Sequence, residues 1–518
     1  MTKPTPLPRT LLVATLLATA PCAGFAQATA QVVTKQYDTG GVYEGTFKDG
    51  KQHGTGTYRL PNGYEYSGDW VEGEIQGQGT AKFPNGSVYK GSFVAGKPEG
   101  AGKITFADGG TYEGDWVNGK IEGSGVAKYA NGVVYEGEFS QAQHDGKGTM
   151  TSPNGYRYEG DWQEGKKTGK ALITYHDGAT YQGDVVEGMR EGKGLLTMPD
   201  GLTYDGEWKN GQIEGTGVLK QANGDVYEGQ MEQGKRNGAG KITYANGDIF
   251  VGNFVNDQRQ GDGKFTGQDG YEYTGNWEAG QMSGEGTLNY SDGAVYTGEF
   301  AKGLPHGQGK IVYANGSSYD GGWVEGRIEG TGTVRDVNGT IYVGELKDAK
   351  NHGTGKITYA DGHSYEGEWV EGVRQGEGRA VFKDGSIYEG AYVDGKRQGR
   401  GKITLPDGFS YVGNWDNGEI NGAGVATYAN GDVYTGTFKN GQRQGSGKMV
   451  YATGEEYDGF WANGKQATQE EAEAADGGTA APAAQASDAE TGSEAATETD
   501  TEAATETDTE AETAPAAD

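Results

Sequence analysis

The sequence has little of what an ordinary enzyme core requires. Only 33% of its 518 residues are hydrophobic, against roughly 45–50% in a typical globular domain, so a conventional packed catalytic core is not expected. A single cysteine, Cys22, excludes an intramolecular disulfide. The formal net charge is −30, and this lack of a basic excess disfavours nucleic acid and anionic membranes as partners.

Glycine and aromatic residues are abundant instead. The chain has 97 glycines together with 32 tyrosines, 14 phenylalanines and 9 tryptophans. So much glycine is typical of low-complexity chains, but so many aromatic side chains argue against disorder. The order of the residues therefore decides between the two, and a search for internal repeats comes first.

The N-terminus has the pattern of a secretory signal. Lys3 and Arg9 precede the apolar run 11–20, and small residues follow through Ala26. The apolar run is about half the roughly 20 residues that a membrane-spanning helix needs, which disfavours an anchor. A lipoprotein signal through Cys22 is disfavoured by the preceding proline. We expect residues 1–26 to be a signal peptide cleaved after Ala26, and the mature protein to be exported to the periplasm or cell envelope, or secreted.

The C-terminus has a different composition. From residue 466 onward the sequence is mainly Ala, Thr, Glu and Asp, with 15 acids and no aromatic, Lys or Arg residue. Such a segment cannot bury apolar area, so residues 466–518 are predicted to be a disordered acidic tail that serves solubility, spacing or acidic binding. Residues 27–465 then carry a net charge of −17.

Between these ends the sequence repeats every 23 residues. Nineteen starts follow one another without insertion from Tyr43 to Tyr457, and Phe250 is the one start that is not tyrosine. With the start as position 1, glycine recurs at positions 3, 8, 12, 14 and 21, and an aromatic residue at position 5. Position 16 is aliphatic, and position 18 is aromatic or apolar. The unit starting at Tyr43 is called repeat 1, and the truncated unit starting at Tyr457 is repeat 19.

This pattern resembles the MORN repeat, YxGxWxxGxxxGxG. The first unit reads YEGTFKDGKQHGTGTYRLPNGYE over residues 43–65, and the resemblance extends over residues 43–464. Because the family serves several roles, the resemblance specifies the fold and leaves the function open. It implies self-association, protein binding or lipid binding. Together with the signal sequence it indicates an exported bacterial protein with a long tandem array.

The residues themselves indicate strands joined by hairpins. Positions 1–5 and 14–18 alternate with period two and are bounded by glycine-rich stretches, as in strands. Asn-Gly or Asp-Gly occupies positions 20–21 in 17 of 18 full repeats, which is a strong hairpin signal. A three-residue turn at 19–21 places position 16 opposite position 1 of the next repeat, and 14 opposite 3. That register gathers the apolar side chains on one face, whereas a one-residue slip would scatter them.

The predicted fold is therefore all-β: an elongated, twisted, single-layer antiparallel meander, a solenoid-like rod of about 19 tandem hairpins. The predicted organisation is a signal peptide at 1–26, a lead segment with a half-repeat strand at 27–42, the array at 43–465 and the tail at 466–518. The same register predicts opposite charges facing each other at positions 15 and 2. The expected pairs are Lys103/Glu113, Lys310/Asp320, Lys356/Glu366, Arg379/Glu389 and Lys448/Asp458.

Tryptophan and phenylalanine alternate at position 5, with one change of phase at repeats nine and ten. Repeats with tryptophan mostly carry isoleucine at position 10, as at Ile75, whereas those with phenylalanine often carry arginine, as at Arg443. Either a two-repeat ancestor was duplicated, with each tryptophan packing on its own isoleucine, or the tryptophans form a spaced partner site. The candidate partner-facing aromatic residues are Trp70, Trp116, Trp162, Trp208, Trp277, Trp323, Trp369, Trp415 and Trp461.

No set of residues has the pattern of a catalytic or metal site. A general base or nucleophile must differ from its equivalents in the other repeats, and we find no such set. The six histidines are dispersed; His53, His306 and His352 share position 11, in a predicted loop. We therefore expect no enzyme activity, no cofactor and no bound metal.

The sequence favours a structural role. A single-layer sheet with one aromatic face leaves that face without a second layer, and such surfaces usually mark a partner. We expect a cell-envelope scaffold that binds a protein or itself through the aromatic face, or through the strand edges at residues 32–37 and 457–461. The alternative is a module that binds lipid or cell-wall glycan. No nucleic acid is expected.

Overall fold

The computed structural model describes residues 31–477. The chain divides between Ala222 and Asn223 into two compact units, which are described separately. The expected signal peptide at residues 1–26 lies outside the described residues, and so does the part of the expected tail from residue 478 onward. Among residues 31–477, no helix is long and apolar enough to cross a membrane.

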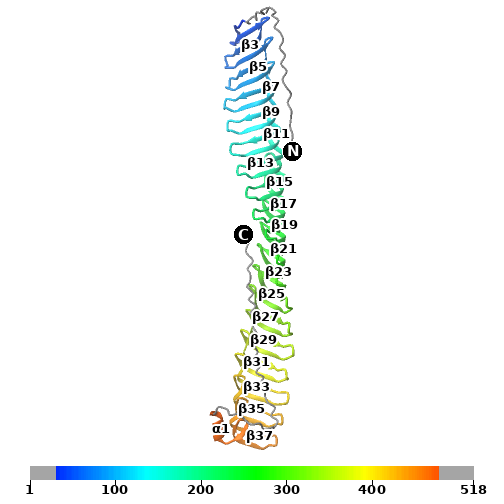
Figure 1. Ribbon diagram of the computed structural model, residues 1–518, viewed down its shortest axis with the longest axis vertical. Coiled ribbons are helices and arrows are strands. Elements are labelled where there is room, and N and C mark those ends of the chain that lie inside the picture. The colour runs from blue at the N-terminus through cyan, green and yellow to red at the C-terminus, as the bar shows by residue number, and fades with distance from the viewer. Residues whose placement is uncertain (1–30, 478–518) are drawn as a thin grey trace, which may run out of the picture. The chain divides into compact units, whose positions relative to one another are not determined.

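Unit 1 is an open antiparallel meander in which each strand pairs with its neighbours in the chain, as the succession of strands in Figure 1 shows. Its strands are β1 (Val33–Gln36), β2 (Val42–Lys48), β3 (Lys51–Arg59), β4 (Glu65–Val71), β5 (Glu74–Lys82), β6 (Val88–Val94), β7 (Lys97–Thr105), β8 (Thr111–Val117), β9 (Lys120–Lys128), β10 (Val134–Ser140), β11 (Gln143–Thr151), β12 (Arg157–Gln163), β13 (Lys166–Thr174), β14 (Thr180–Val186), β15 (Met189–Thr197), β16 (Thr203–Lys209) and β17 (Gln212–Lys220).

Unit 2 has the same architecture and ends in one short helix. Its elements are β18 (Val226–Glu232), β19 (Lys235–Thr243), β20 (Ile249–Val255), β21 (Gln258–Thr266), β22 (Glu272–Glu278), β23 (Gln281–Asn289), β24 (Val295–Ala301), β25 (Leu304–Val312), β26 (Ser318–Val324), β27 (Arg327–Arg335), β28 (Ile341–Lys347), β29 (Lys350–Thr358), β30 (Ser364–Val370), β31 (Val373–Val381), β32 (Ile387–Val393), β33 (Lys396–Thr404), β34 (Ser410–Asp416), β35 (Glu419–Thr427), β36 (Val433–Lys439), β37 (Gln442–Val450), β38 (Glu456–Ala462), β39 (Lys465–Ala467) and α1 (Gln469–Gly477). The prediction of an all-β antiparallel meander built from tandem hairpins is confirmed.

The turn between repeats has the predicted three-residue form. Between repeats 1 and 2, the backbone N–H of Leu60 donates to the carbonyl of Tyr64 at 2.8 Å, and the N–H of Gly63 donates to that of Leu60 at 3.1 Å. Gly63 has φ +87°, the left-handed conformation for which glycine is favoured. The Oδ1 atom of Asn62 accepts from the N–H of Tyr64 at 3.0 Å. Tyr58 consequently lies opposite Tyr66, and Gly56 opposite Gly68, as the sequence predicted.

The second turn, within each repeat, corrects the sequence interpretation. The sequence predicts strands at positions 1–5 and 14–18 and a loop at position 11, but the turn takes only positions 7 and 8, and strands occupy positions 6 and 9–13. In repeat 1 both turn residues, Asp49 at φ 53° and Gly50 at φ 79°, are left-handed, as the right-handed twist of a hairpin requires. Position 11, with His53, therefore lies in strand β3 and not in a loop.

A β-bulge in each hairpin absorbs the extra residues of the second strand. In repeat 1 the register shifts between Gly45 and Phe47, so that Phe47 faces Gln52. Side chains at position 4 accept hydrogen bonds from the strand beyond the bulge: Asp69 Oδ2 accepts from the backbone N–H of Gln78 at 2.8 Å. The bulge places positions 5 and 10 opposite each other on one face of the sheet.

The predicted charge pairs lie in register, and three of the five form ion pairs. Lys103–Glu113, Lys356–Glu366 and Arg379–Glu389 are 3.0, 3.2 and 3.2 Å apart. Lys448 faces Asp458 in the ladder but bonds to Glu456 at 2.7 Å. Lys310 and Asp320 also face each other. All these groups are exposed, so each pair contributes little to stability and serves mainly to favour the register.

The expected disorder from residue 466 is wrong for its first part. Residues 465–467 form β39, and residues 469–477 form α1. The helix begins with a capping box: the N–H of Thr468 donates to Glu471 Oε2 at 2.8 Å, and the N–H of Glu471 to Thr468 Oγ1 at 3.3 Å. The sequence Thr-Gln-Glu-Glu at 468–471 carried this signal, but the acidic composition of the whole segment obscured it.

Candidate interaction surface

The tyrosine that starts each repeat lies buried against one face of the sheet. Tyr89 is 0% exposed, and its hydroxyl donates to the carbonyl of Ser92 at 3.0 Å. Its ring lies against Gly102, where an added Cβ would collide with it. The glycines at positions 3 and 14 are thus the slots that these rings fill. Burial raises the pKa of the Tyr89 hydroxyl to about 12.

The ring at position 5 interlocks consecutive repeats. The Trp70 ring makes edge contacts with Tyr66 of its own repeat and with Tyr43 of the preceding one, at centroid distances of 5.5 and 5.2 Å. Its Nε1 donates to the carbonyl of Gly56, also in the preceding repeat, at 3.2 Å. Such edge-to-face pairs are the favoured geometry between aromatic rings. Each repeat is therefore anchored to the one before it.

The nine candidate tryptophans are core residues. Their exposed fractions lie between 2% and 6%, and eight of the nine donate from Nε1 to a glycine carbonyl of the preceding repeat, at 3.0–3.3 Å. The Nε1 of Trp277 has no hydrogen-bond partner. Their role in binding a partner stays a prediction, and their burial argues against it. The residues concerned are Trp70, Trp116, Trp162, Trp208, Trp277, Trp323, Trp369, Trp415 and Trp461.

The side chains at position 10 cover these rings. Ile75 lies directly opposite Trp70 within one repeat, and Ile121 lies opposite Trp116. In repeats that carry arginine, its guanidinium reaches the ring of the following repeat: the Arg190 Cζ lies 4.1 Å from the Trp208 ring centroid. The arginines of position 10 are therefore half-buried groups on the aromatic face.

Position 18 provides the accessible aromatic side chains. Phe106, Tyr129 and Tyr313 are 39%, 42% and 37% exposed. Some position-18 side chains contact the side chain at position 10 of the next repeat. The Tyr129 hydroxyl lies 2.7 Å from His144 Nε2, and the Gln52 amide donates to the Tyr37 hydroxyl at 2.7 Å. We define the aromatic face as the side chains at positions 1, 5, 10, 16, 18 and 22, and the polar face as those at 2, 4, 13 and 15.

Charge divides between these two faces. Position 10 carries seven basic residues and no acidic one: Lys167, Arg190, Arg236, Arg259, Arg374, Arg397 and Arg443. In unit 1, from residue 43 to 222, no Asp or Glu occupies any position of the aromatic face. The acidic residues of unit 1 therefore lie at positions outside the aromatic face, whereas in unit 2 that face carries Asp225, Asp248, Asp336, Asp432 and Glu455. Sequence reasoning treated the net charge as a property of the whole array and missed that the aromatic face of unit 1 carries no acid, although the repeat positions contain this information.

The described residues contain no cluster of three or more His, Cys, Asp or Glu side chains that could hold a metal ion. Several position-11 side chains, His306 among them, bond to the next hairpin turn instead, whereas the Nδ1 atoms of His53 and His352 have no hydrogen-bond partner. The Oε2 of Glu99 accepts from the N–H of Asn118 at 2.7 Å, and His306 Nδ1 accepts weakly from that of Glu325 at 3.5 Å. These side chains link one hairpin to the turn of the next through hydrogen bonds.

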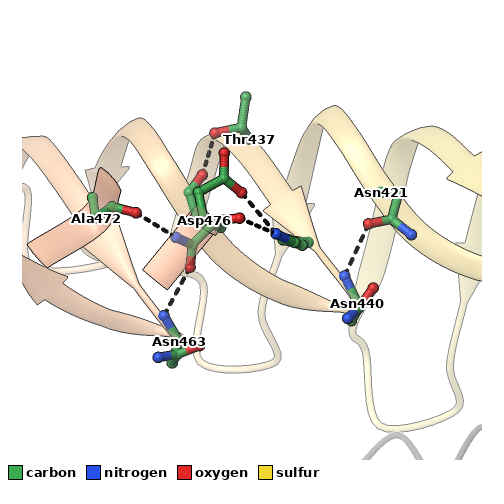
Figure 2. A network of polar contacts seen from close by, with 8 residues as sticks. Asn421, Thr437, Asn440, Asn463, Ala472 and Asp476 are labelled. Carbon is green, nitrogen blue, oxygen red and sulfur yellow. Dashed lines mark hydrogen bonds and ion pairs between the residues drawn. The ribbon is translucent and has the colours of Figure 1, made fainter. Parts of the chain in front are cut away.

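The two ends of the array differ. Strand β1 pairs with β2 on one side, and its residues are exposed, as expected for an open edge. The expected C-terminal edge at residues 457–461 is partly covered, because β39 pairs with Phe460–Ala462. Helix α1 packs there too (Figure 2): Gln444, only 6% exposed, donates to the Ala472 carbonyl at 2.9 Å and accepts from the Asn463 N–H at 3.0 Å.

Comparison with known proteins identifies the family. The family model described as "MORN repeat" matches eighteen times between residues 43 and 456, so the chain belongs to the MORN repeat proteins. The matched residues are 43–63, 66–88, 89–111, 112–134, 135–155, 158–180, 181–203, 204–226, 227–249, 250–270, 273–295, 296–318, 319–341, 342–364, 365–387, 388–409, 411–433 and 434–456. A repeat-based binding scaffold is the general role that this family membership supports. No curated protein matches the sequence.

Solved structures show only distant likeness. The TCP domain of SAS-4 from Drosophila melanogaster, in complex with a proline-rich motif of Ana2, is 14% identical, with a TM-score of 0.21, over 33% of this chain and 86% of that one. The TCP10 domain of CPAP from Danio rerio is 14% identical, with a TM-score of 0.16, over 47% and 93%. A streptogramin B lyase is 12% identical, with a TM-score of 0.11, over 57% and 90%. At these TM-scores the likeness carries no argument about function.

Proposed function

We propose that this MORN repeat protein is a non-catalytic scaffold of the cell envelope that holds a partner protein, or a second copy of itself, along its aromatic face. The observation that carries the proposal is the repeated row of accessible aromatic side chains at position 18, with Phe106 and Tyr129 in consecutive repeats. A partner that contacts several repeats at once gains affinity from each of them.

A crosslinking experiment in intact cells tests the surface. A photoreactive amino acid replaces Tyr129 on the aromatic face or, as a control in the same unit, Glu113 on the polar face. Both positions are exposed, so accessibility alone does not distinguish them. We expect discrete crosslinked products from position 129 and none from position 113. Equal products from both positions would contradict the proposal.

The envelope location rests on the N-terminal sequence. Residues 1–26 have the charged, apolar and small-residue regions of an export signal. The test is cell fractionation combined with N-terminal sequencing of the mature protein, in which we expect a start at Gln27. A cytoplasmic protein that retains residues 1–26 would rule out this part of the proposal.

The alternative function is recognition of cell-wall glycan or lipid. One observation favours it: the accessible rings of Phe106 and Tyr129 stand in consecutive repeats, about 10 Å apart for two strands, which suits stacking on an extended polymer. Because the tryptophans are buried, the test uses Phe106→Ala with Tyr129→Ala. Retention on peptidoglycan or liposomes that is lost in this double variant would favour the alternative over the protein scaffold.

A further inference from the structure

Two arginines in unit 2 stand one repeat apart on the aromatic face. Arg374 lies in β31 and Arg397 in β33, both at position 10 and both half-buried. Phe382, at position 18 of the intervening turn, has its ring centroid 6.0 Å from the Arg397 Cζ. The two guanidinium groups and this ring therefore form one continuous part of the face.

Their contacts leave the positive charge without a counterion. The Arg374 Nη2 donates to the Tyr359 hydroxyl at 3.2 Å. The Arg397 Nη2 donates to the Gly418 carbonyl at 2.7 Å, and its Cζ lies 4.3 Å from the Trp415 ring centroid. Neither guanidinium forms an ion pair with a carboxylate within residues 31–477. A half-buried charge of this kind is stabilised when an anion pairs with it.

The surroundings on this face are free of acidic residues. In repeats 14 to 16 the positions of the aromatic face hold Tyr, Leu, Trp, Asn, Arg, Ile, Ala, Phe, His and Ser, with no Asp or Glu. The carboxylates of these repeats belong to other positions; Glu366 and Glu389, for example, are occupied by ion pairs on the polar face. Rings and guanidinium groups already occupy this part of the aromatic face. It therefore accepts an anionic chain that carries no bulky side chains.

The chain contains a segment of that chemistry. Residues 478–518 include 11 Asp or Glu residues, with no Lys, Arg or aromatic residue, and nine of the acids fall between Glu490 and Glu512. The segment follows α1, whose Asp476 carboxylate lies 3.0 Å from the Lys439 Nζ in repeat 18 (Figure 2). Arg397 is two repeats and Arg374 three repeats before that point, about 20 and 30 Å at two strands per repeat. The twelve residues before Glu490 span up to about 40 Å when extended, so the acidic stretch reaches both arginines.

We propose that the aromatic face of repeats 15 and 16 binds the chain's own acidic C-terminal segment, residues 478–518, through ion pairs to Arg374 and Arg397. A partner that uses this part of the face must displace the segment. The segment therefore acts as a competitor that rejects weak or uncharged ligands and yields to strongly anionic ones. The proposed contact does not depend on the scaffold function, because it forms within the chain when no partner occupies this part of the face.

The test uses the full chain with a photoreactive amino acid in place of Phe382. After irradiation, mass spectrometry of the digested protein locates the crosslinks. We expect crosslinks to peptides from residues 478–518. Mixing isotopically heavy and light protein distinguishes contacts within one chain from contacts between copies. Absence of crosslinks to that segment, or crosslinks only between copies, would overturn the proposal.

Two sets of variants establish that charge drives the contact. R374Q with R397Q removes both guanidinium groups of the face, whereas R379Q with R400Q removes the same charge from exposed positions of the polar face in the same repeats. We expect the first pair to lower the crosslink yield about tenfold, the loss of two partly buried ion pairs, and the second to leave it within about twofold. We expect replacement of the nine acids of 490–512 by Gln and Asn to lower the crosslink yield as much as R374Q with R397Q does, while the array stays unaltered. Equal effects of the two arginine pairs would refute the assignment. Crosslinks from position 129 in unit 1 test the scaffold function separately.

Discussion

The guanidinium carbon of Arg397 lies 4.3 Å from the centre of the Trp415 ring, and the two residues belong to consecutive repeats. Arg443 lies at the same distance from Trp461. Four of the nine tryptophans, Trp208, Trp277, Trp415 and Trp461, are thus covered by an arginine of the preceding repeat. Trp415 is also faced in its hairpin by Ile420 of its own repeat. Where isoleucine occupies position 10, as at Ile420, this geometry agrees with the expectation that the tryptophan packs on the isoleucine of its own repeat.

The Arg397 contact gives a stability prediction. Arg397→Met retains most of the apolar volume but loses the cation–π contact and the bond to Gly418, and we expect the local free energy of opening to fall by about 1–2 kcal/mol. Hydrogen exchange of the β33 and β34 amides measures it, because a repeat array opens locally and not as one unit. Arg400→Met, exposed in the same strand, is the matched control and should have no measurable effect. An equal effect of both changes would contradict the assigned contact.

The glycine at position 14 gives a second prediction. A Cβ added at Gly102 would collide with the ring and hydroxyl of Tyr89, so Gly102→Ala should destabilise β6 and β7 by at least about 2 kcal/mol. Gly96 has a left-handed φ of 76° and open space around it, and asparagine tolerates that conformation. Gly96→Asn should therefore be nearly neutral. Hydrogen exchange of the β6 and β7 amides compares the two variants; a neutral Gly102→Ala would show that the space between the Tyr89 ring and Gly102 can widen.

A third prediction concerns the C-terminal end. Gln444→Leu removes the bond to the Ala472 carbonyl of α1 as well as that to the Asn463 N–H (Figure 2). We expect α1 to detach, with an increase in hydrogen exchange over residues 465–477 that corresponds to about 1–3 kcal/mol. Gln375→Leu is the control, because Gln375 bonds only the next turn, at Asp394. Unchanged protection of α1 in Gln444→Leu would mean that β39 alone holds the helix.

The pH dependence of His144 supplies a fourth prediction. Its ring stacks on Tyr135 at 3.7 Å between centroids, and burial, aided by Lys167, lowers its pKa to about 4. An unfolded chain binds this proton near pH 6.5, so the stabilising contribution of neutral His144 is present above pH 6.5 and decreases as the pH falls toward 4. NMR titration of the imidazole measures the pKa, and Lys167→Met should raise it. A pKa near 6.5 would show that the ring is solvated.

Much of the hairpin could be predicted from the sequence because it is a local property. Pro61 with Asn62-Gly63 defines the three-residue turn between repeats. The alternation of side chains along each strand then places Tyr58 opposite Tyr66. The second turn was missed because position 7 varies, from Asp49 to Glu72 and Ala95, although all three adopt positive φ. The conformation there is imposed by the strands on either side and by Gly50 or its equivalents, and not by the residue at position 7.

The candidate site was less predictable, since burial depends on neighbours two strands away. The sequence placed Trp70 and its equivalents on the correct face but could not show that Tyr43, Tyr66 and the position-10 side chains cover them. The accessible residues, such as Phe106 and Tyr129, instead lie at position 18, directly before the turn between repeats.

By itself, the sequence determined the repeat, the register and the separation of an aromatic face from a polar one, because a strand alternates its side chains with period two. Only the tertiary structure decided which aromatic side chains reach the surface. It also showed that the C-terminal edge is partly covered and that Arg374 and Arg397 have no counterion within residues 31–477. These properties depend on the close approach of consecutive repeats, where ring size, the bulge and the reach of long side chains act together.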